Sequence, residues 1–360
     1  MRFGWLVILL AAPILHASDA GFLRSVQRIS TLASTVPVNG DVNPYGVAVV
    51  PVTTGALVQG HVLVSNFNNS ANLQGTGTTI VQVSPSGAPS LFASLDSKHL
   101  AGDCPGGVGL TTALVALRSG FVIVGSLPTQ DGTAATAKAG CLIVLNSSGH
   151  AVETISGHGI NGPWDMTALD MGSGAVLFVT NVLNGTVAGN GSVVSQGSVL
   201  RIVLSVPMNG VPTPVSFRPI ASSFPERTDP AALVIGPTGL GLGADGTLFV
   251  ADTLDSRIAA IPDAVHATND AGAGLTVAQG GALKQPLGMA VAPNGDILTV
   301  NASDGLMVET TPTGQAAGTR FVDVSHSRNG AGTLFGLATA PPGLGIYFVD
   351  DGNNTLNALQ

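Results

Sequence analysis

A short phrase recurs along the chain at a nearly fixed spacing. Its clearest copy runs Pro237-Thr-Gly-Leu-Gly-Leu-Gly-Ala-Asp-Gly-Thr-Leu-Phe-Val-Ala-Asp252, and a second copy begins at Pro286, 49 residues later, and ends at Asn301. In each copy two apolar runs flank an Asp-Gly or Asn-Gly pair, which is the strongest local signal for a β-hairpin. Self-similarity at a period of roughly 20–50 residues indicates a repeat architecture.

Two anchors align six copies along the chain. The first anchor is a glycine that leads into an apolar strand, and the second is a small polar residue that closes the next strand. The first anchors lie in Pro44–Gly46, Gly107–Gly109, Pro163–Asp165, Pro237–Gly239, Pro286–Gly288 and Leu334–Gly336; the second are Asn66, Ser126, Asn181, Asp252, Asn301 and Asp350. A third strand follows in each copy, and a fourth is visible at 89–94. The pattern predicts an all-β, six-bladed β-propeller of four-stranded antiparallel blades.

The last copy stops at Gln360, after its third strand. An additional strand pattern, 26–33, precedes the first copy. We expect this N-terminal strand to complete the sixth blade and close the ring, because closure removes exposed sheet edges. The insertions at 68–78, 127–139 and 205–230 are expected to be surface loops that build a recognition surface.

The first twenty residues have the layout of a secretory signal peptide. Arg2 is followed by an apolar run over 5–15 and by the small-residue cleavage site Ser18-Asp19-Ala20, with Ala17 as a second option. The run is short for a permanent membrane span, although a retained anchor is the alternative. We therefore predict a signal peptide at 1–20, one propeller domain at 21–360, a secreted or periplasmic location and no transmembrane span in the mature chain.

Composition and cysteine content narrow the possible partners. Charged residues make up 9% of the chain and the net charge is −8, so no basic patch is available for nucleic acid. The two cysteines, Cys104 and Cys141, form an even pair, which in an exported protein suggests a disulfide. Two reduced thiols are the alternative.

The segment 249–258, Phe-Val-Ala-Asp-Thr-Leu-Asp-Ser-Arg-Ile, closely resembles the core of an NHL repeat, and Asp350-Asp-Gly-Asn-Asn repeats part of it. The resemblance covers all six copies and is sharpest in the last three. In overall form such propellers are similar to the SMP-30/gluconolactonase and streptogramin-lyase groups. This similarity implies one possible function, a divalent-metal-dependent hydrolase or lyase.

The chain departs from those enzymes at the residues that would carry the chemistry. An SMP-30-like enzyme would place a Glu, an Asn and an Asp around one ion, and a streptogramin-lyase-like enzyme would place a histidine near the channel. None of Glu153, Glu226 and Glu309 lies at an anchor, and no histidine does. The first hypothesis is therefore an exported scaffold that binds a small molecule, a glycan or a protein.

Polar residues at the second anchors are the candidate metal ligands. Asn and Asp oxygens near one channel end would suit Ca²⁺ or another divalent cation, and no other cofactor is indicated. The alternative is that they shape turns by bonding to nearby backbone. With Asp165 added, the candidate set is Asn66, Asp165, Asn181, Asp252, Asn301 and Asp350.

The third copy departs from the repeat in an informative way. Asp165 stands where most other copies have the anchoring glycine, and Trp164 precedes it; Tyr45 and Phe335 precede two other anchors. Aromatic residues at this level suit a funnel for an apolar or sugar-like ligand. The candidate ligand-binding set is therefore Tyr45, Trp164, Asp165 and Phe335. The alternatives are packing between blades for the aromatics and a local cap for Asp165.

Overall fold

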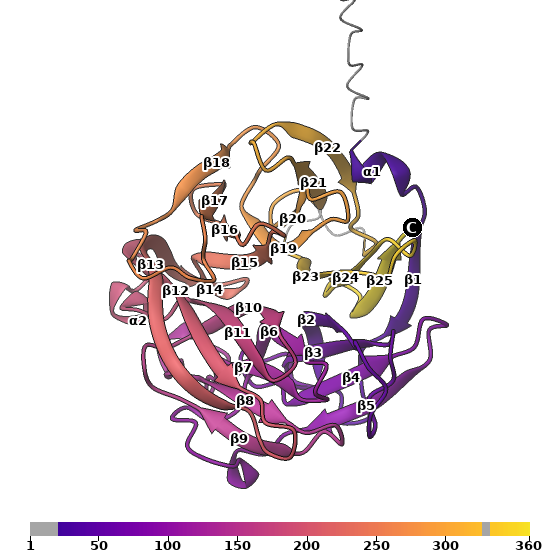
Figure 1. Cartoon of the computed structure of the whole chain (residues 1–360), viewed down its shortest axis with the longest axis vertical. Coiled ribbons are helices and arrows are strands. Elements are labelled where there is room, and N and C mark those ends of the chain that lie inside the picture. The colour runs from indigo at the N-terminus through magenta and orange to yellow at the C-terminus, as the bar shows by residue number, and fades with distance from the viewer. Residues whose placement is uncertain (1–20, 326–331) are drawn as a thin grey trace, which may run out of the picture.

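Six antiparallel sheets form a ring around a central channel in the computed structural model, which describes residues 21–325 and 332–360 (Figure 1). The predicted signal peptide, 1–20, lies outside the described residues. Blade one contains β2 (Val42–Val49), β3 (Val62–Asn68), β4 (Thr79–Val83) and β5 (Pro89–Ser94); blade two contains β6 (Leu110–Ala116), β7 (Val122–Ser126), β8 (Cys141–Leu145) and β9 (Ala151–Ile155).

The remaining blades follow in chain order, which confirms the predicted six-bladed propeller. Blade three contains β10 (Pro163–Asp170), β11 (Gly174–Asn181), β12 (Val194–Ser205), β13 (Thr213–Asp229) and β14 (Leu233–Ile235); blade four contains β15 (Pro237–Leu242), β16 (Leu248–Asp252), β17 (Arg257–Ile261) and β18 (Leu275–Gln279). Blade five contains β19 (Pro286–Val291), β20 (Ile297–Asn301), β21 (Leu306–Thr310) and β22 (Ala316–Phe321); blade six contains β23 (Leu334–Thr339), β24 (Ile346–Asp350), β25 (Thr355–Leu359) and β1 (Ile29–Ser34).

The ring is closed by a strand from each end of the chain. β1 pairs antiparallel with β25, with Ile29 opposite Leu359 and Ser34 opposite Thr355. The contact continues past the strand, because Gln360 N donates to Arg28 O at 2.8 Å. This pairing confirms the expected role of the N-terminal strand, which fills the outer position of blade six.

Blade three differs from the four-stranded expectation. β13 is 17 residues long. Its C-terminal end pairs with the short fifth strand β14, with Arg227 opposite Ile235 and Asp229 opposite Leu233. Most of the predicted insertion at 205–230 is therefore strand rather than surface loop. The repeat pattern missed this extension because β12 and β13 pair through several bulges, which disrupt a clean two-residue alternation.

Neighbouring blades pack face to face and bury most of the strand residues. The second and third strands of the blades are buried on both faces, because each sheet lies between two others. Two helices, α1 (Phe22–Ser25) and α2 (Thr186–Gly189), and two 3₁₀ turns at 97–99 and 134–136 complete the described elements. None of the helices in the described ranges is long and apolar enough to cross a membrane.

A disulfide fastens blade two. Cys104, in the connector before β6, is bonded to Cys141 at the start of β8, with the two Cα atoms 5.3 Å apart. Both cysteines are buried in an apolar cluster with Leu110 and Val108. The bond therefore ties the segment that enters the blade to one of its central strands.

Replacing both cysteines by alanine should lower the free energy of unfolding by about 3–4 kcal/mol, because the bond closes a loop across a sequence separation of 37 residues. Urea unfolding of oxidised wild type and of the double variant measures the difference. Reducing agent should destabilise the wild type and leave the double variant unchanged. Equal stability of the two oxidised proteins would contradict this role.

Candidate functional site

The inner strands of the six blades line the channel and give it two different ends. We call the end at which these strands begin the closed end and the other the open end. The second anchors lie at the closed end because each pairs with the start of an inner strand, as in Pro44 with Asn66 and Pro237 with Asp252.

Aromatic side chains fill the channel at the closed end. The ring of Tyr45 stacks on Phe335 at 3.8 Å and on Phe67 at 4.5 Å, and the indole Nε1 of Trp164 donates to Val234 O at 3.2 Å. Val234 belongs to β14, so the extra strand of blade three covers the aromatic cluster. A void of about 10 Å³ lies beside Tyr45 and Trp164, and a separate cavity of about 270 Å³ borders Phe335. Tyr45, Trp164 and Phe335 therefore pack against one another and against the blades.

The amide second anchors fasten the connectors between blades. Asn181 Oδ1 accepts from Asn161 N at 3.0 Å, and Asn301 Oδ1 accepts from Lys284 N at 3.0 Å. Asn66 Nδ2 donates to the carbonyl oxygen of Thr35 at 3.0 Å. In each case the partner lies in the connector that leads into the inner strand of the same blade.

Asp350 plays the same part in blade six. Its Oδ2 accepts from Val324 N at 2.9 Å and from Ser325 N at 3.0 Å, in the connector that precedes β23. Burial, together with the neighbouring carboxyl of Asp323, raises the pKa of Asp350 to about 6. The next residue, Asp351, has its pKa raised to about 8 by burial and by the charges of Asp350 and Asp323.

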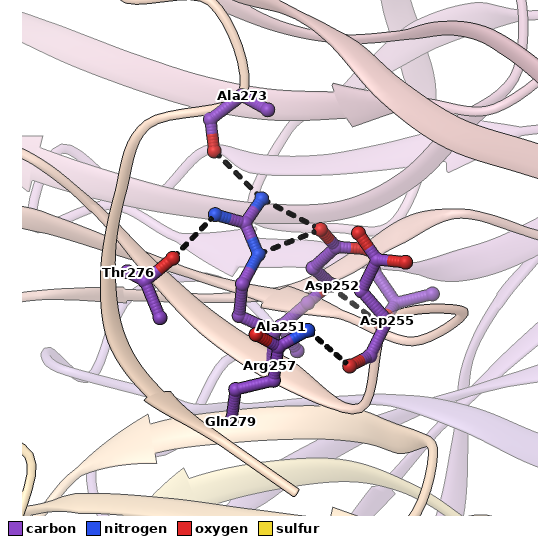
Figure 2. A network of polar contacts seen from close by, with 8 residues as sticks. Ala251, Asp252, Asp255, Arg257, Ala273, Thr276 and Gln279 are labelled. Atoms are coloured by element: carbon purple, nitrogen blue, oxygen red, sulfur yellow. Dashed lines mark hydrogen bonds and ion pairs between the residues drawn. The ribbon is translucent and has the colours of Figure 1, made fainter.

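Asp252 forms a buried ion pair within blade four (Figure 2). Arg257 Nη2 lies 2.7 Å from Asp252 Oδ2, and the same nitrogen donates to Ala273 O at 2.9 Å. Arg257 Nη1 donates to Thr276 Oγ1 at 3.1 Å, so the guanidinium joins the second, third and fourth strands of the blade. Burial raises the pKa of Asp252 to about 6 even beside this partner.

The candidate metal ligands are not brought together around one point. Five of them make the contacts just described, each in its own blade, whereas Asp165 lies inside the channel. Within residues 21–325 and 332–360, no three His, Cys, Asp or Glu side chains form a group that could hold a metal ion. The assignment of these six residues as metal ligands, three of which are asparagines, stays a prediction.

Asp165 is a buried carboxylate that bridges two blades. Its Oδ1 accepts from Met166 N at 2.8 Å, and its Oδ2 accepts from Leu240 N at 2.9 Å in the inner strand of blade four. The residue is only 8% exposed, yet it lines a cavity in the channel. Burial raises the pKa of Asp165 to about 7, and the two backbone donors offset only part of that cost.

Glycine is required, for a steric reason, where most other blades have the position equivalent to Asp165. A Cβ atom added to Gly288 would lie 1.7 Å from Phe335 O, and one added to Gly239 would lie 2.4 Å from Leu287 O. No side chain fits where inner strands approach this closely. In blade three, by contrast, the side chain of Asp165 reaches across to the next inner strand and bonds to it.

Thr112 is a second polar residue that lines the channel cavity, and sequence analysis missed it. The repeat alignment placed the blade-two anchor at Gly107–Gly109, but Leu110 pairs with Ser126 and Leu114 with Val124, so the irregular start of the strand falls at 111–113. Thr112 is 4% exposed, and its hydroxyl has no hydrogen-bond partner among the described residues. Counting seven residues back from the hairpin glycine Gly120, as from Gly246 to Gly239, places the blade-two anchor at Ala113, directly after Thr112.

The open end of the channel contains a cavity of about 320 Å³. Asp165 and Thr112 lie toward its inner end, next to the aromatic cluster. Asp170 lies at the rim, where it accepts a hydrogen bond from Arg118 N at 2.6 Å. The walls include one equivalent apolar residue from each blade, together with polar groups such as Thr167 and Thr339; the apolar residues are Val47, Leu114, Met166, Leu240, Met289 and Leu337.

Comparison with known proteins supports the fold and goes no further. No protein-family model matches the sequence, and a search of curated proteins found no match. A gluconolactonase from Xanthomonas campestris has a TM-score of 0.58 at 14% identity, covering 95% of this chain and 92% of its own. Regucalcin, a calcium-binding protein from Agrobacterium tumefaciens, has a TM-score of 0.53 at 11% identity, covering 91% and 93%.

A streptogramin B lyase structure gives a TM-score of 0.51 at 12% identity, covering 92% of this chain and 97% of its own. The expected likeness to gluconolactonase-like and lyase-like propellers is thus confirmed at the level of architecture. At these identities the likeness carries no activity to this chain, because one fold serves many functions.

Replacing Arg257 by methionine should lower the free energy of unfolding by about 3–5 kcal/mol, since it leaves the buried Asp252 without its partner. The control is Lys284→Met, which removes the pair with Asp304, whose lysine is 57% exposed; it should cost less than about 1 kcal/mol. Urea unfolding measures both. Equal losses would contradict a structural role for the buried pair.

Stability should fall as the pH rises from about 4 to about 8. Burial raises the pKa of Asp165 to about 7 and that of Glu226 to about 8, so the folded chain holds protons that the unfolded chain has released. Urea unfolding at pH 5 and pH 9 should give the lower free energy at pH 9. Glu226→Gln should reduce that difference; a stability that rises with pH would contradict the assignment.

Proposed function

We propose that this chain is an exported binding protein that holds a small, largely apolar amine in the open end of its channel, with the ammonium group on Asp165. The observation that carries the proposal is the position of this carboxylate. It is buried, it lines the cavity, and no cationic side chain pairs with it among the described residues. A buried carboxylate without a counter-charge either takes up a proton or binds a cation.

The rest of the cavity favours a ligand with one polar end. Apolar side chains such as Met166 and Met289 line it, and so does Thr112, whose hydroxyl has no hydrogen-bond partner among the described residues. The volume of about 320 Å³ is at the lower end of the range for small-molecule sites. An ammonium ion would approach the remaining lone pairs of the carboxylate, while its hydrocarbon part would displace water from the walls.

Export is supported by the cysteine pair. The Cys104–Cys141 bond requires an oxidising compartment in most organisms, and this agrees with the signal-peptide layout of residues 1–20. A binding protein that meets its ligand outside the cytoplasm would profit from a rigid, closed ring. Together these features support a secreted or periplasmic location.

A hydrolase or lyase is the second candidate function, and one observation favours it. A carboxyl group with a pKa of about 7 is well matched to general acid–base catalysis near neutral pH. In this alternative Asp165 would exchange a proton with a lactone or a similar substrate in the same cavity. Turnover of a lactone panel that disappears in Asp165→Asn would establish it.

The binding proposal is tested with primary alkylammonium ions, from methylammonium to hexylammonium, by isothermal titration calorimetry. Affinity should increase with chain length and should increase from pH 6 to pH 8, as Asp165 ionises. The corresponding alcohols and carboxylates should bind at least about tenfold more weakly.

Asp165→Asn should lower the affinity for the ammonium probes at least about tenfold, because an amide cannot balance their charge. The matched control is Asp131→Asn, which alters an aspartate in an exposed segment of blade two and should leave binding unchanged. Failure of every ammonium probe to bind wild-type protein, or equal binding by Asp165→Asn, would overturn the proposal.

A further inference from the structure

Another buried carboxylate lies in blade five, two blades along the ring from Asp165. Glu309, in β21, is 0% exposed and is one of three glutamates in the chain. It lies far along the sequence from the residues that it contacts, which belong to the N-terminal segment. Neither the channel site nor the repeat accounts for it.

The carboxylate binds the first described residues of the chain. Oε1 accepts a hydrogen bond from Phe22 N, and Oε2 accepts one from Leu23 N at 2.8 Å. Asn294 Nδ2 donates to Oε1 at 3.3 Å. The two backbone donors are the first two residues of helix α1, which lies beside β22 at the edge of the ring (Figure 1).

Gly21 lies directly against the same carboxylate. A Cβ atom added to Gly21 would lie 2.7 Å from Glu309 Oε2 and 3.1 Å from Ala317 O. The nitrogen of Gly21 is bonded to the same Cα atom, so it lies in the immediate neighbourhood of the carboxylate. A larger residue at this position would require the Glu309 side chain to shift.

The charge of Glu309 has no cationic side-chain partner in the described part of the chain. Removing a carboxylate from water is costly unless a counter-charge compensates it. Backbone donors supply only partial charges. The nitrogen of Gly21 would supply a full positive charge close to Glu309 if it were the end of the chain.

We propose that cleavage between Ala20 and Gly21 creates the partner of Glu309. A signal peptidase adds water across the Ala20–Gly21 peptide bond; Ala20 leaves with the new carboxylate, and the Gly21 nitrogen takes a proton to become an ammonium group. That ammonium pairs with the buried carboxylate of Glu309. The site is therefore a receptor for the mature N-terminus of this chain.

The pair would link maturation to closure of the ring. α1 leads directly into β1, the strand that completes blade six by pairing with β25. Fixing Gly21 on blade five thus fastens the segment that crosses to blade six. Cleavage at the other possible position, after Ala17, would leave three additional residues and no ammonium group at Gly21.

Three forms of the protein test this proposal. One begins at Gly21, released from a fusion that leaves no additional residue; a second carries one additional alanine before Gly21; the third begins at Gly21 and carries Glu309→Gln. The form that begins at Gly21 should melt at least about 2 °C above the alanine-extended form. This difference should disappear when both N-termini are compared in the Glu309→Gln background.

Glu153→Gln in blade two is the matched control, and it should preserve the difference between the two N-termini. Equal melting temperatures of the two wild-type forms would overturn the proposal. A difference that persists in Glu309→Gln would overturn it as well, because the carboxylate would then not be the partner.

Amine reactivity gives a readout that does not depend on stability. In the folded protein that begins at Gly21, the α-amino group should react with an amine-directed N-hydroxysuccinimide ester at least tenfold more slowly than in the alanine-extended form. Sequencing of the exported protein should begin at Gly21. Equal reactivity of the two α-amino groups, or a mature chain that begins at Ser18, would contradict the proposal.

Discussion

The close approach of neighbouring inner strands at the channel is the constraint on which the structure depends. At Gly336 an added Cβ would lie 2.1 Å from Tyr45 O, and at Gly288 one would lie 1.7 Å from Phe335 O. Because no side chain fits there, the blades converge tightly, and the aromatic residues that precede the glycines meet at the closed end. The recurring glycine is thus the sequence signature of the ring, and the ring in turn fixes where a ligand can enter.

One exception to this constraint places a carboxylate in the channel. Blades one, four, five and six have glycine at this level, whereas blade two has Ala113 and blade three has Asp165. Asp165 accepts hydrogen bonds from the backbone nitrogens of Met166 and Leu240, and these bonds hold it rigidly between blades three and four. A carboxylate fixed at a cavity wall is preorganised for one kind of ligand group, which is the physical basis of the proposed specificity.

The fold could be predicted from the sequence because its signals are local and repeated. The hairpin pairs such as Asp245-Gly246, the six anchors and the unpaired N-terminal strand were sufficient to give the blade number and the closure. The site could not be predicted as fully, since it depends on contacts between distant segments. The covering of Trp164 by Val234 depends on β14, which has no counterpart in the other blades. Asn181 and Asn301 bond to the connectors between blades. Predicting this role would have required the positions of their partners, which lie outside the repeat phrase.

The most direct test of the proposed channel site is the titration of the Asp165 carboxyl group itself. Carbon-13 NMR of protein labelled at the aspartate side chains, with Asp165 assigned by its loss in Asp165→Asn, would follow ionisation with pH. The account predicts a midpoint near pH 7 in the free protein and a lower midpoint when hexylammonium is bound, because the cation stabilises the charged form. A midpoint near the ordinary value for aspartate, unchanged by hexylammonium, would contradict the central claim.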